Sequence, residues 1–182
     1  MTQPESAEPA CRVRASAESD LPAITAIYAH HVRFGLGSFE EMPPDAAEME
    51  RRRAEVLRRG LPYLVAEGPA GAVQGYAYAA PYRARSAYRY SLEDSIYVAP
   101  AAERRGIGRA LLGELVERCA ALGYRQLIAV IGDSGNLGSI GLHERMGFRR
   151  VGLLPAAGFK HGRWVDSVLM QRELGDGAAT PP

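Results

Sequence analysis

Residues 97–112, YVAPAAERRGIGRALL, place an apolar strand, a proline and an arginine-bearing glycine loop directly before a predicted helix. A helix N-terminus leaves backbone N–H groups without intrahelical partners and has the positive end of the helix dipole. Gly106 and Gly108 lack a Cβ atom, so the backbone can curl and approach an anion closely. The nearby cationic side chains are Arg104, Arg105 and Arg109. The segment therefore predicts a phosphate site, and a pyrophosphate fits this description.

Three kinds of glycine loop can be compared with this segment. A dinucleotide-binding turn, GxGxxG/A, is disfavoured because Leu111 occupies the third glycine position and because the loop lies in the middle of the chain. A nucleotide-triphosphate loop is excluded because Arg109, rather than Lys followed by Ser or Thr, comes after Gly108. A glycine turn that only begins a helix stays open on this segment alone.

A second motif follows downstream in residues 136–148, NLGSIGLHERMGF. It predicts a short helix that ends at a glycine and leads into a strand. Taken together, RGIGR and NxxSxxLHxxxGF resemble the motifs of the GCN5-related N-acetyltransferases (GNAT). Because this family transfers an acetyl group from acetyl-coenzyme A to an amine, the resemblance implies an acetyl-CoA-dependent N-acetyltransferase.

Two further segments narrow the resemblance. Residues 81–98 and 156–166 are similar to the phosphinothricin and methionine sulfone or sulfoximine N-acetyltransferase branch, and the likeness extends from about Arg12 to Leu174. The resemblance also implies a homodimer. Glu103 departs from the pattern, because the family usually has Gln or Arg there. We expect its carboxylate to point outward and cofactor affinity to be somewhat weakened.

The pattern of apolar residues predicts an α+β protein without internal repeats. The order of elements matches the GNAT fold that the resemblance implies, a mixed, mostly antiparallel sheet flanked by helices. One domain is expected over residues 11–174, and residues 1–10 and 175–182 have the composition of disordered ends. The expected strands span residues 12–15, 63–67, 73–80, 92–98, 127–131, 149–154 and 164–173, and the expected helices span residues 21–31, 45–59, 105–122 and 139–146.

The balance of charges argues against two classes of partner. The 22 Lys and Arg residues face 21 Asp and Glu residues, so the formal net charge of +1 gives no overall field that would attract nucleic acid or an anionic membrane. The N-terminal sequence has neither a basic n-region nor an apolar h-region, and no stretch approaches the ~18 apolar residues of a membrane span. We therefore expect a cytoplasmic protein without nucleic acid or membrane partners.

Cysteine and histidine usage predicts neither disulfides nor a metal site. Cys11 and Cys119 lie far apart in the sequence, so a disulfide framework is not expected. The histidines at positions 30, 31 and 161 lack metal-like spacing to Cys, Asp or Glu. No metal cofactor is predicted.

Glu93 is the candidate general base. Aminolysis of a thioester needs a neutral amine, a polarised carbonyl and a proton for the departing thiolate. Glu93 lies where the strand that leads to the phosphate loop begins, near the expected meeting point of acetyl-thioester and amine. The resemblance implies the same residue, acting directly or through a water. The structural alternative, compatible with the first, is a salt bridge to Arg83, Arg85 or Arg89.

Two residues of the second motif are candidates on the cofactor side. The resemblance implies that His143 hydrogen-bonds or protonates the coenzyme A sulfur, where many members have a tyrosine; a purely structural histidine is the alternative. Asn136 is placed to cap its helix, and in the family this residue also contacts the cofactor. The cofactor-binding residues implied by the resemblance are Ile96, Tyr97, Val98, Arg104, Arg105, Gly106, Ile107, Gly108, Arg109, Asn136 and Arg145.

The acceptor is expected at residues 82–90, where Arg and Tyr alternate. A single-stranded nucleic-acid groove shows the same pattern, but the near-zero net charge disfavours it. A substrate with a carboxylate and a second polar oxygen group explains the arginines better, since guanidinium grips planar anions bidentately. Asp94 is a weaker candidate. It follows Glu93 directly on the same strand, and neighbouring side chains of a strand face opposite sides of the sheet. The predicted acceptor-binding residues are Arg83, Arg85, Glu93, Asp94 and Ser95, and the resemblance to the family adds Phe39 and Lys160.

The sequence thus predicts transfer of an acetyl group from acetyl-CoA to the α-amino group of a small amino-acid-like substrate. The resemblance names phosphinothricin, methionine sulfone and methionine sulfoximine as the leading acceptors. Two alternatives stay open: the same chemistry on another small amine, and a non-catalytic acyl-CoA-binding module that kept the fold.

Overall fold

The computed structural model describes residues 11–182, and the disorder predicted for residues 1–10 lies outside the described residues. Eleven α-helices and β-strands follow one another in this part of the chain. They are β1 (Arg12–Ala15), α1 (Leu21–Phe34), α2 (Ala46–Arg58), β2 (Tyr63–Glu67), β3 (Val73–Pro81), β4 (Ser91–Val98), α3 (Ile107–Ala121), β5 (Gln126–Gly132), α4 (Leu137–Arg145), β6 (Arg149–Lys160) and β7 (Arg163–Glu173).

The strands form one seven-stranded sheet in the order β1-β2-β3-β4-β5-β7-β6. Every neighbouring pair is antiparallel except β4 and β5, which run parallel. The α+β class and the mixed, mostly antiparallel sheet are therefore confirmed. None of the helices within residues 11–182 is long and apolar enough to cross a membrane.

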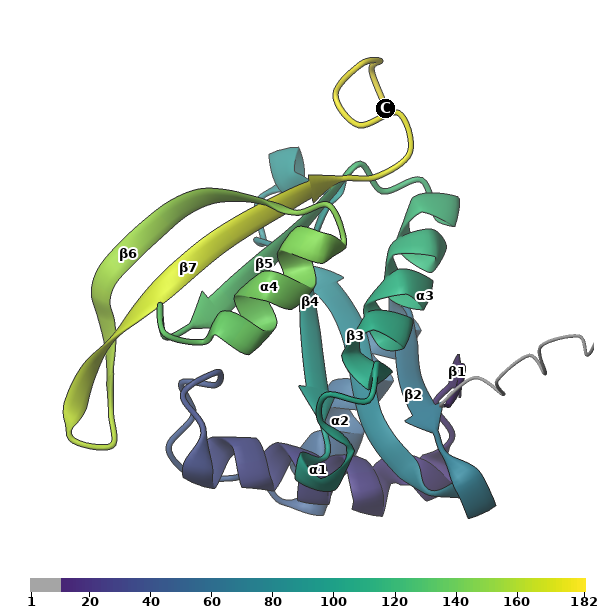
Figure 1. The fold of residues 1–182 in the computed structure, drawn as a ribbon. Helices are drawn as coiled ribbons and strands as arrows, with labels where there is room; N and C mark the ends of the chain where they lie inside the picture. Colours follow the sequence, from purple (N-terminus) through teal and green to yellow (C-terminus); the bar gives the residue numbers. More distant parts are fainter. Residues whose placement is uncertain (1–10) are drawn as a thin grey trace, which may run out of the picture.

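Helices cover both faces of the sheet (Figure 1). The alternation of side chains along β4 assigns the faces. Tyr97 packs against Tyr28 of α1 with ring centroids 5.0 Å apart, so one face is covered by α1 and by α2, which packs against α1. Asp94, out of phase with Tyr97, bonds His143 of α4 on the opposite face, where α3 also packs. The sheet thus separates an α1/α2 side from an α3/α4 side.

Two helices begin two residues away from the predicted start, for local reasons. The helix expected from residue 105 starts at Ile107, because Gly106 takes the left-handed conformation with φ +83°. The helix expected from Ser139 starts at Leu137, because the side chain of Asn136 accepts a hydrogen bond from the Ser139 backbone N–H and caps it.

The C-terminal part of the chain is more regular than expected. β6 continues to Lys160 instead of ending at residue 154, because its pairing with β7 resumes after two register shifts. Residues 175–178 form turns and residues 179–180 a bend, and the disorder expected for residues 175–182 stays a prediction. There the Arg125 guanidinium lies 3.4 Å from the Asp176 carboxylate and 3.3 Å from the Thr180 hydroxyl.

Candidate active site

A split in the sheet defines the candidate site. The parallel β4–β5 pairing covers only Ser91–Glu93 and Gln126–Ile128. Beyond Glu93, β4 stays paired with β3 and β5 stays paired with β7, and the two strands diverge (Figure 1). Within residues 11–182, the β5-facing edge of β4 therefore has no strand partner from Asp94 to Val98, so backbone polar groups there can pair with an amide-containing ligand. The predicted cofactor residues Ile96, Tyr97 and Val98 lie on this stretch.

The predicted phosphate loop lies at the end of β4. Arg104 and Gly106 both have positive φ, +59° and +83°, and these turns present the first N–H groups of α3 to solvent. Ile107 is 1% exposed and anchors the helix on the sheet. A Cβ atom on Gly108 would lie 3.1 Å from Leu142 of α4, so this glycine also allows the two helices to approach closely. The loop can accept an anion at its exposed surface.

The exposed side chains of this loop support that reading. Arg104, Arg105 and Arg109 are exposed and form no ion pair with any other residue of the range 11–182. Glu103 is exposed as well, in extended backbone conformation. The cationic groups of the loop are thus free to meet an anion.

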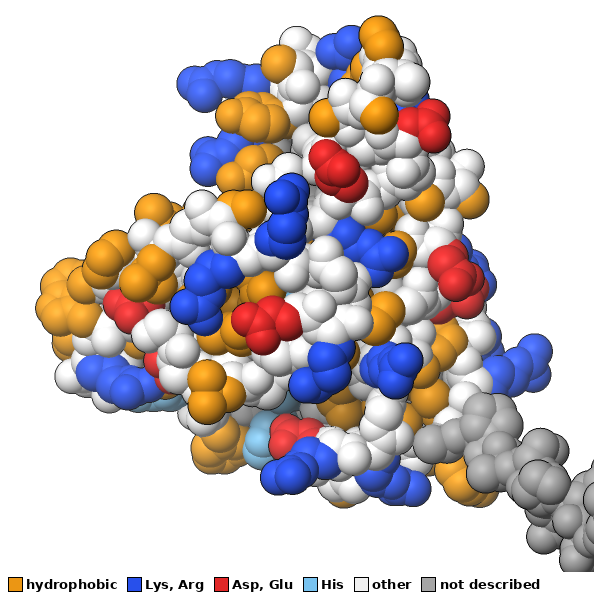
Figure 2. Space-filling model, turned by 45° about the horizontal axis from the view of Figure 1, so that its top comes forward, with side chains coloured by type: hydrophobic (Ala, Val, Ile, Leu, Met, Phe, Trp, Pro, Cys, Tyr) orange, Lys and Arg blue, Asp and Glu red, His pale blue; other side chains and the backbone are white. Residues whose placement is uncertain are grey.

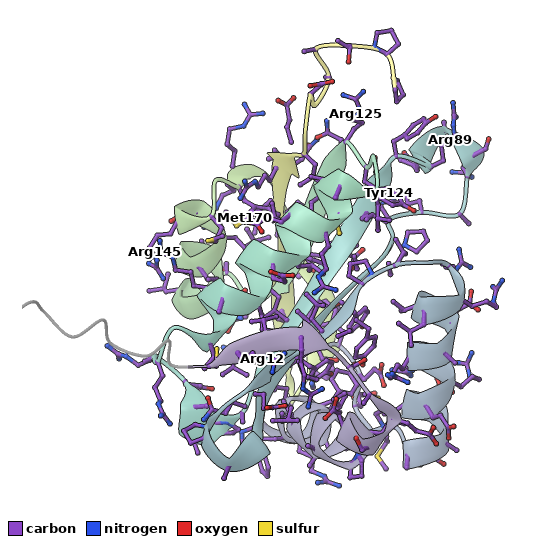
Figure 3. All side chains as sticks on the ribbon, turned by 90° about the vertical axis from the view of Figure 1, so that its right-hand side faces the viewer. Arg12, Arg89, Tyr124, Arg125, Arg145 and Met170 are labelled. Carbon is purple, nitrogen blue, oxygen red and sulfur yellow. The ribbon has the colours of Figure 1, made fainter. Side chains whose placement is uncertain are left out.

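A second basic feature lies next to the loop. A cavity of about 830 Å³ is lined by Arg109, Arg145 and residues that sequence reasoning missed. Arg145, labelled in Figure 3, is an exposed residue of the last turn of α4. Figure 2 shows basic side chains spread over the face formed by α3 and α4. The full lining is Arg109, Arg145, Met146, Gly147, Arg149, Arg172 and Glu173. Four guanidinium groups against one carboxylate suit the phosphate-rich end of a nucleotide.

Glu93 lies at the point where the split begins. Its side chain is half-buried on the α1/α2 side. Burial raises the pKa of Glu93 above its usual range, the neighbouring Asp94 carboxylate raises it further, and Arg83 partly offsets both. A carboxylate with a raised pKa is a stronger base. Within the described residues Glu93 forms no ion pair, so the alternative salt bridge is not what holds it.

A cavity of about 410 Å³ adjoins Glu93 on the same face. Ala80, one of its lining residues, pairs directly with Glu93 across β3 and β4, so the two side chains lie side by side. Arg83 lines this cavity, whereas Arg85 is exposed and does not. Ser95 lies on the Glu93 face, paired with Tyr78 of β3. The complete lining is Glu55, Val56, Arg59, Ala80, Pro81, Arg83 and Ala84.

Arg59 and Glu55 of this cavity were not predicted. They lie where α2 ends, far in sequence from the Arg-Tyr segment, and their guanidinium and carboxylate are 2.6 Å apart. Helix periodicity indicated only an exposed, charged surface there, so no sequence signal pointed to a site. With Arg83, the cavity offers two guanidinium groups to a small anionic acceptor.

Asp94 and His143 form a buried pair on the α3/α4 side. His143 Nε2 lies 3.0 Å from Asp94 Oδ2, and His143 Nδ1 lies 2.8 Å from the Ser139 carbonyl oxygen. Burial alone would lower the pKa of His143, but the hydrogen bond and charge of Asp94 outweigh it and raise the pKa. With these two partners, both ring nitrogens of His143 are hydrogen-bonded. Asp94 faces away from the Glu93 side, so its position does not support the predicted acceptor contact.

Phe39 and Lys160, both predicted to bind the acceptor, differ in access. Phe39 is 41% exposed, so its ring can reach a ligand. Lys160 is 2% exposed and its ammonium donates to the Ser38 carbonyl oxygen at 2.6 Å. The ammonium of Lys160 is thus turned to the backbone, in contrast to the predicted substrate contact. Among residues 11–182, no group of three or more His, Cys, Asp and Glu side chains is arranged to hold a metal ion.

Comparison with known proteins places this geometry in a family. The profile described as "Acetyltransferase (GNAT) family" matches residues 24–148. Phosphinothricin N-acetyltransferase of Alcaligenes faecalis is 59% identical over 178 residues, which is 98% of this chain and 90% of that protein. L-methionine sulfoximine/L-methionine sulfone acetyltransferase of Pseudomonas aeruginosa is 38% identical over 169 residues, or 93% of this chain and 98% of that protein.

Solved structures agree with the sequence relatives. The crystal structure of a GNAT superfamily phosphinothricin acetyltransferase from Sinorhizobium meliloti in complex with AcCoA superposes with a TM-score of 0.92 at 51% identity, over 95% of this chain and 93% of that chain. A putative acetyltransferase from Salmonella typhimurium with its cofactor acetyl-CoA superposes with a TM-score of 0.89 at 34% identity, over 94% and 98% of the two chains.

Proposed function

The chain belongs to the acetyltransferase (GNAT) family, and from this premise we propose that it acetylates the α-amino group of a small amino-acid-like substrate. The co-substrate is acetyl-CoA. The leading acceptors are phosphinothricin, methionine sulfone and methionine sulfoximine, after the names of the relatives. One observation favours this function above others: a half-buried carboxylate with a raised pKa, Glu93, lies between the split in the sheet and an arginine-lined cavity.

The residues of the α3/α4 side fit acetyl-CoA. The unpaired edge of β4 suits the amides of the pantetheine arm, and the N-terminus of α3 with Arg104 and Arg105 suits the pyrophosphate. The large cavity with Arg109 and Arg145 suits the remaining phosphate. When bound, acetyl-CoA supplies the thioester carbonyl carbon that the amine attacks.

Glu93 prepares the acceptor. Its carboxylate takes one proton from the acceptor ammonium, directly or through a water, and passes that proton to solvent. The freed amine nitrogen then bonds to the carbonyl carbon, the carbon–sulfur bond breaks, and a second proton leaves the nitrogen and ends on the sulfur. Arg83 and Arg59 hold the acceptor carboxylate in the small cavity, which orients the amine toward the split.

The role of His143 is that of a positioning residue. Because both of its ring nitrogens are bonded, it acts through Asp94, the neighbour of Glu93 on β4. The pair holds α4 against β4 where the strands separate. It also keeps the Asp94 carboxylate in place, whose charge raises the pKa of Glu93.

A second copy of this chain is the proposed partner. β6 is the last strand of the sheet in the described part of the chain, so one of its edges is unpaired there, and an apolar edge strand of this length invites association. Large hydrophobic side chains are exposed on the β6–β7 hairpin, including Leu154 (50%), Phe159 (57%) and Trp164 (67%). Figure 2 shows hydrophobic side chains gathered at this end of the molecule. Light scattering of the protein and of Leu154→Asp tests this: a dimer that the substitution dissociates is expected.

The cytoplasm is the proposed location. Cys11, which is half-buried, and Cys119 are both free thiols. Free thiols persist in reducing compartments. Fractionation of the producing cell decides this point, and recovery outside the cytoplasmic fraction would contradict it.

Release of free thiol from acetyl-CoA tests the proposed function. The purified protein is assayed with phosphinothricin, methionine sulfone, methionine sulfoximine and a panel of unrelated amines. Fast release with the first three alone is expected. Release only with other amines would keep the enzyme and replace the acceptor.

The non-catalytic alternative predicts cofactor binding without turnover. Calorimetry with acetyl-CoA, run beside the thiol assay, separates the two possibilities. Binding without thiol release in the presence of every amine would overturn catalysis and favour an acyl-CoA-binding module.

A further inference from the structure

The loop between α1 and α2 bridges the open end of the split. We define the bridging loop as residues 35–42. At the β4 end, His31 in the last turn of α1 bonds the Val98 carbonyl oxygen at 2.8 Å. At the β5 end, the loop backbone comes so close that a Cβ atom on Gly132 would lie 2.1 Å from the Leu36 carbonyl oxygen. The loop thus spans the two diverging strands on the α1/α2 side, where the acceptor cavity lies.

Lys160 holds this loop from a distant part of the sheet. It is the last residue of β6, is 2% exposed, and donates from Nζ to the Ser38 carbonyl oxygen at 2.6 Å. Within residues 11–182 it forms no ion pair, and Glu41 and Glu40 act on it only through space. Burial of an ammonium is costly unless it is bonded, so the bond to Ser38 is the interaction that offsets this burial.

The choice of lysine at this position is informative. Lys160 is the only lysine of the chain, and the other 21 basic residues are arginines. A guanidinium has five N–H donors in a fixed plane, which a single buried carbonyl cannot satisfy. A compact ammonium on a flexible stem can reach one carbonyl oxygen with less unsatisfied polarity. The position therefore requires a point contact to the backbone rather than a bidentate anion contact.

The opposite side of the bridging loop is held by α1 and α2. The Tyr28 hydroxyl lies 3.0 Å from the Ser38 hydroxyl and donates to the Glu40 carboxylate at 2.8 Å. Arg52 of α2 donates to the same carboxylate at 2.6 Å. Lys160 is the matching contact from β6, so the loop is held on one side by α1 and α2 and on the other side by β6.

Phe39 lies between these two attachments. A Cβ atom on Gly158 of β6 would lie 2.7 Å from its ring, and one on Gly132 would lie 3.1 Å from it. The two glycines thus leave room for the ring, and 41% of Phe39 stays exposed. The position of an accessible aromatic ring beside the split therefore depends on where the loop is held.

We propose that Lys160 is a positioning residue that fixes the bridging loop and Phe39 at the acceptor side of the split, and so sets acceptor affinity without touching the acceptor. This inference rests on the proposed function, since it assigns the loop to the acceptor side of the same site.

The test replaces Lys160 by Met, which keeps the length of the side chain and removes the donor. Hydrogen exchange of residues 35–42 is expected to become about tenfold faster, because a buried hydrogen bond from a charged donor is lost. Because the same hydrogen bond is lost, the KM for the acceptor is expected to rise about tenfold. The kcat and the KM for acetyl-CoA are expected to stay within about twofold of the wild-type values. Arg150→Met, on the exposed part of the same strand, is the matched control and should change neither quantity.

A second variant reaches the loop without altering Lys160. Gly158→Ala places a methyl group against Phe39 and should displace the loop. Because the chain has one lysine, an amine-acylating reagent followed by peptide mass measurement reports its protection directly. Lys160 is expected to be unreactive in the wild-type protein and reactive in Gly158→Ala, with the KM for the acceptor raised.

Two results would overturn the positioning role. A raised acceptor KM in Lys160→Met with unchanged loop exchange would mean that Lys160 contacts the acceptor directly. Faster loop exchange with an unchanged acceptor KM would mean that the loop is no part of the acceptor site. Failure of the proposed function is a different result, namely that the wild-type protein acetylates none of the acceptors.

Discussion

The Nε2 atom of His143 lies 3.0 Å from Oδ2 of Asp94, and both side chains are almost fully buried between α4 and β4. The contact joins two elements that meet where the β4–β5 pairing ends. Asp94 is also the residue next to Glu93, on the opposite face of the same strand. The pair therefore links the stability of the α3/α4 side to the pKa of Glu93 on the other side.

The stability of the protein should depend on pH through this pair. The pKa of His143 is raised in the folded protein, so its stabilising contribution is fully present below the unfolded value of about 6.5 and is lost as pH rises through the folded value. We expect the free energy of unfolding to fall with rising pH over this window. Chemical denaturation at a series of pH values measures it.

Asp94→Asn should remove this pH dependence. It should also lower the free energy of unfolding by about 3–5 kcal/mol at low pH, because a buried ion pair loses one of its charges. His161→Asn, at an exposed position, should keep the slope of the wild-type protein. Parallel pH curves for the wild-type protein and Asp94→Asn would contradict this assignment.

Glu93→Gln should lower kcat by about 10²–10⁴, the usual contribution of a general base. Affinity for acetyl-CoA should stay unchanged, since Glu93 faces the acceptor side. In the wild-type protein, kcat/KM should rise with pH through the pKa of Glu93, because only the deprotonated carboxylate accepts a proton. Glu117→Gln, an exposed carboxylate on α3, should behave as the wild-type protein. Full activity of Glu93→Gln would move the base elsewhere.

Arg83→Gln should shift the pH profile to higher pH. The guanidinium of Arg83 lowers the pKa of Glu93, so its removal raises that pKa and moves the acid limb of kcat/KM upward. The KM for a carboxylate-bearing acceptor should also rise about tenfold through the lost charged hydrogen bond. Arg85→Gln is the comparison, because Arg85 does not line the cavity, and its effect should be smaller. An equal effect of both substitutions would mean that the acceptor lies outside this cavity.

Glu103→Gln should tighten acetyl-CoA binding. Its carboxylate is exposed in the phosphate loop, close in sequence to Arg104 and Arg105, where it opposes an incoming anion. The interaction between exposed, screened charges contributes at most about 1 kcal/mol to binding, so the KM for acetyl-CoA should fall by up to about fivefold. The effect should be smaller at high salt, because salt screens the charges further. The acceptor KM should not change. Steady-state kinetics at two salt concentrations checks this, and a raised KM for acetyl-CoA would show that the carboxylate supports the loop.

Much of the fold was predictable because its signals are local. Apolar periodicity located the helices and most strands. Errors arose at the ends of these elements, because a single residue there can determine where the element begins. Gly106 in a left-handed conformation moved the start of α3, and the cap by Asn136 moved the start of α4. The extent of β6 was missed because register shifts against β7 interrupt the alternation that a sequence reader follows.

The sequence by itself determined the features that depend on neighbours along the chain: the glycine loop before α3, and the opposite orientation of Glu93 and Asp94 on one strand. Only the tertiary structure decided which side chains meet across the fold. Asp94 and His143 are 49 positions apart, and Lys160 and Ser38 are 122 apart, so both contacts depend on sheet order and register. The cavity beside Glu93 likewise joins α2 to β3. Such contacts follow from the packing of whole elements, which no local pattern of residue types encodes.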